Sequence, residues 1–126
     1  MQCFDYVGSP ERDGKLQFFK EIDVFSLPTV YQEPKGIPVL EALACGIPVV
    51  QPRHGAFPEM LAETGGGVLF EPGRAESLAE SLADLLTDPD KCTKLGAEGR
   101  QPVVTNRSSR RMAEETLSVY DLYVRS

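Results

Sequence analysis

The run from Val30 to Val50 constrains the fold more than any other part of this chain, because it predicts a helix with a defined start and end. Pro38 suits the first turn of a helix, where its missing N–H would have no partner anyway. Gly46 is a usual residue for ending a helix. Mostly apolar strands are predicted on either side, at Asp23–Leu27 and Pro48–Gln51. A helix between two such strands is typical of a parallel sheet that is covered on both faces.

The same alternation extends over residues 1–73, which we interpret as an α/β part. Further short strands are predicted at Phe4–Val7 and Gly67–Phe70, and further helices near residues 15–22 and 57–63. Together these elements predict one Rossmann-like parallel sheet of about four strands with helices on both faces.

Residues 74–126 predict helices alone. The first contains an apolar stripe at helical spacing, formed by Leu78, Leu82, Leu85 and Leu86, which is typical of a core-facing helix. The second is predicted over 90–100 and should end before Pro102, which would remove a hydrogen bond in its interior. A last helix is predicted from Ser108 or Ser109, with an apolar side that can face a core. We therefore treat residues 1–126 as a single domain with a helical end.

Two glutamates lie on either side of the predicted helix start. Glu33 falls in the loop before the helix, and Glu41 lies about one turn inside it. A helix start offers unpaired amides and a partial positive charge, so we expect an anion there, most simply a phosphate. An ionised carboxylate only accepts hydrogen bonds and therefore suits hydroxyl groups. Phosphate and hydroxyl groups together predict a sugar nucleotide as the ligand.

Composition excludes several other classes. The net charge of −6 argues against a groove for nucleic acid, which would need a basic face. The 3 cysteines have no C-x-x-C spacing, so neither a disulfide framework nor a zinc site is predicted, and a reducing cytosol is the simple interpretation. Neither a signal peptide nor a stretch of membrane-spanning length is recognisable. We expect a soluble, cytoplasmic chain, although a partner domain could lie against a membrane.

The motifs of this chain occur in an order that resembles the retaining, nucleotide-sugar-dependent glycosyltransferases of family 4 (group 1). After Glu33 and Glu41, which seven residues separate, come Ala42–Gly46, Ile47–Val50, His54–Glu59 and Gly65–Gly73. The resemblance extends from about Phe4 to Leu95. Two acids alone would be weak evidence, whereas the ordered set is strong evidence.

The resemblance implies a GT-B fold of two facing Rossmann-like domains, of which this chain would be a part of the carboxy-terminal, donor-binding domain. The first two strands of that domain, its phosphate-binding Arg and Lys, and the amino-terminal domain with the acceptor site would all be missing. We therefore expect no turnover from this chain alone. The missing strands would lie beside Asp23–Leu27. As a hypothesis, we expect this open edge to be covered by Phe4–Val7, by a strand swap or by pairing in a homodimer.

The resemblance also implies roles for residues at the helix start. Glu33 would be the catalytic residue, accepting hydrogen bonds from the donor sugar and stabilising an oxocarbenium-like transition state; a plain loop acid is the alternative. Glu41 would bind the ribose hydroxyls, or would simply complement the helix dipole. The amides of Gly36, Ile37 and Val39 would bind the diphosphate.

Four further residues are donor-site candidates. Lys35 could neutralise the diphosphate, and a solvated lysine is an equal alternative. Arg53, His54 and Gly55 follow the third predicted strand, at the edge where open α/β sheets place ligands. Arg53 could bind phosphate or be a surface arginine, and a structural role is favoured for His54. The resemblance implies neither a metal nor a cofactor, with the nucleotide sugar as the substrate.

Three other functions are alternatives. A sugar-nucleotide epimerase or a phosphorylase of the same architecture would share these motifs. A regulatory binding module such as a receiver domain has a similar length and alternation, but Val7–Ser9 and Gln51–Arg53 lack the acids that receivers need. A degenerate remnant that only binds nucleotide or assembles is the third.

Overall fold

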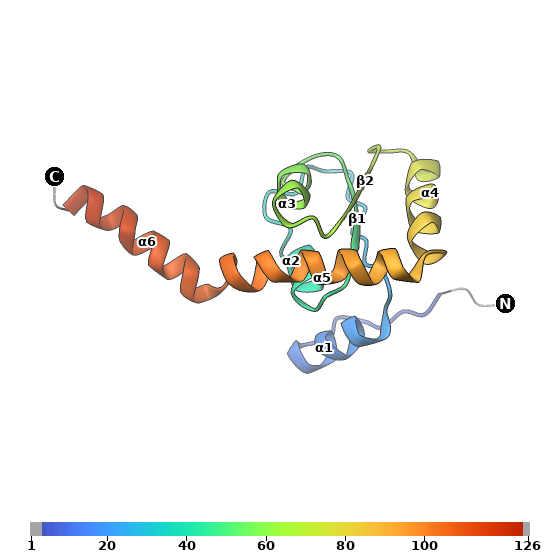
Figure 1. The fold of residues 1–126 in the computed structure, drawn as a ribbon, viewed down its shortest axis with the longest axis horizontal. Coiled ribbons are helices and arrows are strands. Elements are labelled where there is room, and N and C mark those ends of the chain that lie inside the picture. The colour runs from blue at the N-terminus through green and yellow to red at the C-terminus, as the bar shows by residue number, and fades with distance from the viewer. Residues whose placement is uncertain (1–3, 125–126) are drawn as a thin grey trace.

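The computed structural model describes residues 4–124 and has two parallel strands at its centre, surrounded by helices (Figure 1). Strand β1 (Val49–Pro52) pairs with β2 (Gly67–Phe70), with Val49 opposite Gly67. The helices are α1 (Arg12–Glu21), α2 (Ile37–Ala44), α3 (Phe57–Thr64), α4 (Ala75–Leu86), α5 (Pro89–Asn106) and α6 (Ser109–Val124). The predicted α/β class, with a parallel sheet and helices, is confirmed.

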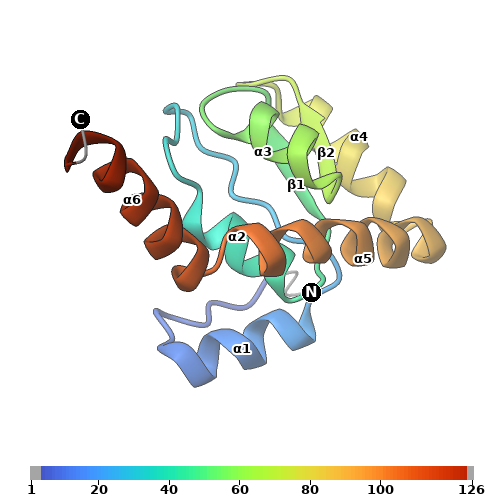
Figure 2. The same cartoon turned by 60° about the vertical axis from the view of Figure 1, so that its left-hand side comes forward.

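Helices cover both faces of the sheet. Successive β1 residues point to opposite faces, so they pack against different helices. Val49 belongs to a buried cluster with residues of α1, α2, α3 and α5, whereas Val50 belongs to a second cluster with Leu85 of α4. The long helix α5 packs along α2 and α3 and continues to α4, which makes it the common support of both clusters (Figures 1 and 2).

The sheet is smaller than the sequence predicted. Phe4–Val7 is not a strand, and its apolar side chains are exposed. Of the predicted strand Asp23–Leu27, only Phe25 forms a bridge, to Val49 on the side of β1 opposite β2. Among residues 4–124, no hydrogen bond pairs the backbone groups of Val24 and Ser26. The prediction of about four strands is therefore wrong for this structure, because a strand forms only beside a neighbour with which it can exchange hydrogen bonds.

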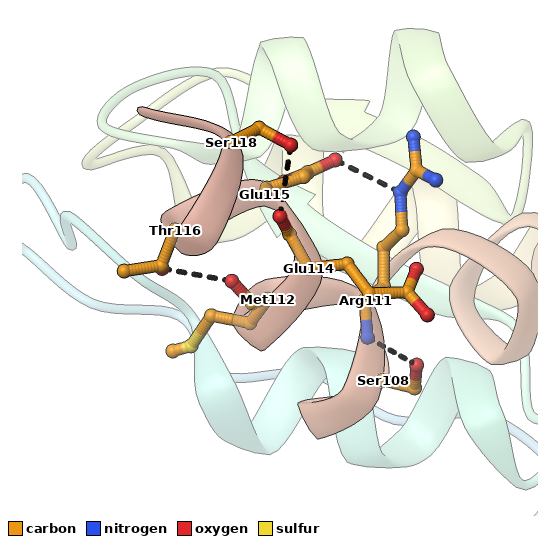
Figure 3. Close-up of polar contacts among 7 residues, drawn as sticks. All are labelled: Ser108, Arg111, Met112, Glu114, Glu115, Thr116 and Ser118. Atoms are coloured by element: carbon orange, nitrogen blue, oxygen red, sulfur yellow. Dashed lines mark hydrogen bonds and ion pairs between the residues drawn. The ribbon is translucent and has the colours of Figure 1, made fainter. Parts of the chain in front are cut away.

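The helical end also differs from the prediction. Helix α5 continues through Pro102 to Asn106, because Val103 beyond the proline is buried in the first cluster and this packing offsets the lost hydrogen bond. Helix α6 begins as predicted, since Ser108 Oγ accepts a hydrogen bond from the Arg111 amide at 3.1 Å (Figure 3). Its apolar side chains do not face a core: Met112, Leu117 and Tyr120 are all more than half exposed.

Local polar contacts support α6 in place of tertiary packing (Figure 3). Arg111 Nε lies 3.0 Å from Glu115 Oε1, and Thr116 Oγ1 donates to the Met112 carbonyl at 2.8 Å. Exposed ion pairs of this kind contribute about 0.3–0.5 kcal/mol each. Within residues 4–124, none of the helices has the length and apolar character needed to cross a lipid bilayer.

Candidate functional site

Helix α2 is the element around which the candidate site is built. Its inner side is fully buried at Val39, Ala42 and Leu43, which pack on β1, α3 and α5. Gly36 precedes the helix with a φ of +63°, and a Cβ on it would come within 2.9 Å of Met60 Cε. A glycine is therefore needed where the incoming loop turns into the helix against α3.

The Glu33 carboxylate lies at the start of α2. Its Oε1 accepts hydrogen bonds from the amides of Gly36 and Lys35, each at 3.2 Å. The bond from Gly36, and then the bond from Lys35, hold the pKa of Glu33 below its ordinary value because they stabilise the ionised form. The side chain thus occupies one of the amides that we expected to bind a diphosphate. An anion can reach the Gly36 amide only if Glu33 turns away.

The other two predicted amides differ in accessibility. Among residues 4–124, neither the Ile37 nor the Val39 amide has a hydrogen-bond acceptor, as is usual in the first turn of a helix. Ile37 is 54% exposed, whereas Val39 has no exposed surface. The structure therefore contradicts the expected contact of Val39 with a ligand, because the apolar inner side of α2 buries the whole residue. The contact of Ile37 stays a prediction.

Glu41 lies between two cavities on the outer side of α2. The first, of about 500 Å³, lies between α1 and α2, and its lining includes Lys15, Leu16, Phe19, Glu41 and Cys45. The second, of about 780 Å³, lies among the start of α2, α3 and the α5–α6 junction, and its lining includes Lys35, Ile37, Glu41, Glu59 and Arg107. The structure thus brings Lys35, Ile37 and Glu41 together. Glu33 lines neither cavity.

A lysine that the sequence analysis did not select lies beside Glu41. Lys15 Nζ is 3.7 Å from Glu41 Oε2, and both side chains are partly exposed. Such a pair contributes about 0–1 kcal/mol and can be exchanged for other partners. Nothing in the sequence of α1 indicated that this helix packs beside α2. Desolvation, and then the charge of Glu41, raise the pKa of the Cys45 thiol, which disfavours its thiolate form.

Arg53, His54 and Gly55, in the loop after β1, line neither cavity. Arg53 Nε lies 3.5 Å from Glu71 Oε1 in an exposed pair, which favours the surface-arginine alternative. His54 Nε2 lies 3.0 Å from the Thr29 carbonyl, which fits the favoured structural role. Gly55 packs against the backbone of Glu33. Within the described part of the chain, no three acidic, histidine or cysteine side chains cluster as a metal site would require.

Comparison with known proteins decides the family. The model of the family "Glycosyl transferases group 1" matches residues 4–102. The chain belongs to the group 1 glycosyltransferases. This membership confirms the resemblance to a carboxy-terminal GT-B domain and argues against a receiver-type regulatory module.

Relatives of this group 1 domain include named enzymes. Alpha-maltose-1-phosphate synthase of Mycolicibacterium smegmatis is 38% identical over 103 residues, which are 77% of this chain and 26% of that enzyme. A GDP-mannose-dependent monoacylated alpha-(1-6)-phosphatidylinositol monomannoside mannosyltransferase of Corynebacterium glutamicum is 31% identical over 124 residues, 94% of this chain and 32% of that enzyme. The chain therefore spans about a quarter to a third of the length of these relatives.

Solved structures agree on the fold. Sucrose-phosphate synthase from Thermosynechococcus elongatus matches with a TM-score of 0.78 and 29% identity, over 86% of this chain and 27% of that one. The C-terminal domain of a group 1 glycosyl transferase from Francisella tularensis matches with a TM-score of 0.69 and 24% identity, over 84% of this chain and 53% of that one. The latter likeness bears on the fold alone.

Proposed function

We propose that this chain is the donor-binding part of a retaining glycosyltransferase and that a nucleoside-diphosphate sugar binds along the outer side of α2. The observation that carries the proposal is the position of Glu41, which lines two adjoining cavities on that side. Family membership supports the reaction class. The donor type, the retained configuration and the cytoplasmic location are part of the proposal.

The outer side of α2 offers different chemistry at successive positions. The Ile37 amide, which has no acceptor among residues 4–124, and Lys35 lie at the start of the helix, where an anion is favoured. Glu41 lies one turn further, about 6 Å along the helix axis at 1.5 Å per residue, where it can accept hydrogen bonds from a ribose. Leu16 and Phe19 line the cavity beyond it and offer an apolar surface for a base. An elongated ligand with phosphate, ribose and base in that order fits this series.

Basic side chains are available to an anionic ligand, although acids line the same cavities: Lys35 and Arg107 lie with Glu59 and Glu115 in the second cavity. Lys35 lies at the phosphate end of the proposed ligand path, and Lys15 lies beside Glu41 in the first cavity. Ribose hydroxyls would compete with Lys15 for Glu41, and the exposed pair is weak enough to allow this. Lys35 would then face the phosphate region of the ligand, and Lys15 would face the ribose and base region.

Glu33 would act at the sugar end of the donor. In transfer, the bond between the anomeric carbon and a diphosphate oxygen breaks, and the nucleoside diphosphate leaves with the electron pair. The acceptor oxygen forms the new bond and gives its proton to the departing diphosphate oxygen. The two amides that hold Glu33 ionised keep a negative charge near the start of α2, which would favour the positive charge that develops on the sugar ring. An amino-terminal domain would bind the acceptor.

Titration calorimetry of this chain with GDP and with UDP tests the proposal. We expect one of the two to bind and Glu41→Ala to weaken binding about tenfold to a hundredfold, since a hydrogen bond to a charged group contributes about 1.5–3 kcal/mol. Glu80→Ala is the matched control, because Glu80 is an exposed glutamate on α4. Absence of binding by both nucleotides, or equal affinity of the Glu41 variant, would contradict the proposal.

A further inference from the structure

Residues 51–56 run beside the loop that carries Glu33 and contact it at several points. Gln51 is fully buried at the end of β1, and its side-chain amide pairs with the backbone of Leu27. Gln51 Oε1 accepts from the Leu27 amide at 2.7 Å, and Nε2 donates to the Leu27 carbonyl at 3.0 Å. A side chain thus takes the place of the strand pairing that ends at Phe25.

Two further hydrogen bonds extend this contact toward Glu33. His54 Nε2 lies 3.0 Å from the Thr29 carbonyl, and because a carbonyl only accepts, this nitrogen carries the proton. The Ala56 amide donates to the Glu33 carbonyl at 2.8 Å. The loop is therefore held near its start, near its middle and at Glu33 itself.

Gly55 sets the distance between the two segments. Its φ is +60°, and a Cβ added to it would lie 2.6 Å from the Glu33 carbonyl oxygen and 2.7 Å from the Glu33 nitrogen. Backbone atoms cannot move aside as a flexible side chain can. Any larger residue at this position would push the Glu33 backbone away.

The loop has little apolar packing of its own. Val30 is 91% exposed and Tyr31 is 58% exposed, so burial does not fix the segment between Leu27 and Glu33. A loop without such burial is held by its polar contacts and by the backbone against which it lies. In this chain hydrogen bonds from residues 51–56 hold Leu27, Thr29 and Glu33, and the Tyr31 side chain adds a hydrogen bond to Glu33 within the loop.

We propose that Gln51, His54 and Gly55 are positioning residues that fix the loop from Leu27 to Glu33 and thereby place the Glu33 carboxylate on the amides of α2. They act through the loop backbone and contact no reacting atom. That this position of Glu33 matters for glycosyl transfer rests on the proposed function. That these residues fix the position of Glu33 does not rest on it.

The pKa of Glu33 provides the readout, followed through the amide resonances of Lys35 and Gly36 in an acid titration of the isotopically labelled chain. Both amides donate to this carboxylate, so their shifts follow its ionisation. In the wild type we expect a midpoint below the ordinary glutamate value. In Gly55→Ala we expect the midpoint to rise toward that value, because displacement of Glu33 weakens both hydrogen bonds.

Gly73→Ala is the matched control. Gly73 has a φ of +74° and no atom within 4 Å of an added Cβ, so this variant carries the same backbone penalty without the contact. Its Glu33 midpoint should equal that of the wild type. A general loss of stability would change the Glu33 midpoint in both glycine variants alike, whereas the proposal predicts a change only in Gly55→Ala.

Gln51→Met and His54→Ala repeat the test without changing a glycine, and they decide it if Gly55→Ala does not fold. Each should raise the midpoint in a chain that keeps its dispersed core resonances. Folded variants whose Glu33 midpoint equals that of the wild type would overturn the proposal. If the wild type binds neither GDP nor UDP, the proposed function fails, but the amide titration still decides whether these residues position Glu33.

Discussion

Leu43→Ala tests whether α2 is anchored as described. Leu43 has no exposed surface, and its Cδ2 lies so close to α5 that a Cβ on Gly99 would come within 2.9 Å of it. The substitution removes three carbon groups at about 0.8 kcal/mol each, or about 2.4 kcal/mol. Because the glycine backbone on the facing side cannot collapse into the space, a cavity should remain and raise the loss to about 3–4 kcal/mol.

Urea unfolding, followed by circular dichroism, measures this loss. With a denaturant dependence of about 2 kcal/mol per M, the midpoint should fall by about 1.5–2 M. Leu86→Ala is the control, because Leu86 is 57% exposed and should change the free energy of unfolding by less than about 0.5 kcal/mol. A loss below about 1 kcal/mol in the Leu43 variant would refute the packing of α2 against α5.

Two predictions concern acid stability and assembly. Since the folded pKa of Glu33 is lowered, its hydrogen bonds stabilise the fold fully above the unfolded pKa, and this contribution is lost as pH falls through the folded pKa. Urea unfolding at several pH values should therefore show a steeper acid loss in the wild type than in Glu33→Gln; equal slopes would speak against the two amide bonds. The unpaired backbone of Val24 and Ser26 predicts association through the sheet edge, so sedimentation should show a dimer, and a monomer at all concentrations would exclude it.

The sequence predicts those elements that local signals define. Pro38 and Gly46 fixed the start and end of α2 to within a residue or two, because they act on the backbone at their own positions. The leucine stripe likewise predicted α4, whose Leu85 is fully buried. Such signals do not depend on the rest of the molecule.

Features that depend on a neighbour were predicted less well. Phe4–Val7 has a strand-like composition but no partner among the described residues, and the apolar side of α6 has no core to face. At the site, the positions of Glu33 and Glu41 relative to α2 followed from the sequence. The hydrogen bonds that the Lys35 and Gly36 amides donate to Glu33 could not be predicted from the sequence, because they depend on how the loop is held.

Helix α2 links the stability of this chain to the proposed binding. Its inner side contributes Val39, Ala42 and Leu43 to the core, and its outer side carries Ile37 and Glu41. A ligand that binds only the folded chain at a hundred times its dissociation constant stabilises it by about 2.7 kcal/mol. This is about two-thirds to nine-tenths of the loss of about 3–4 kcal/mol expected for Leu43→Ala, so a bound nucleotide would restore most of the stability that the cavity removes. The same helix would thus couple core packing to occupancy of the donor site.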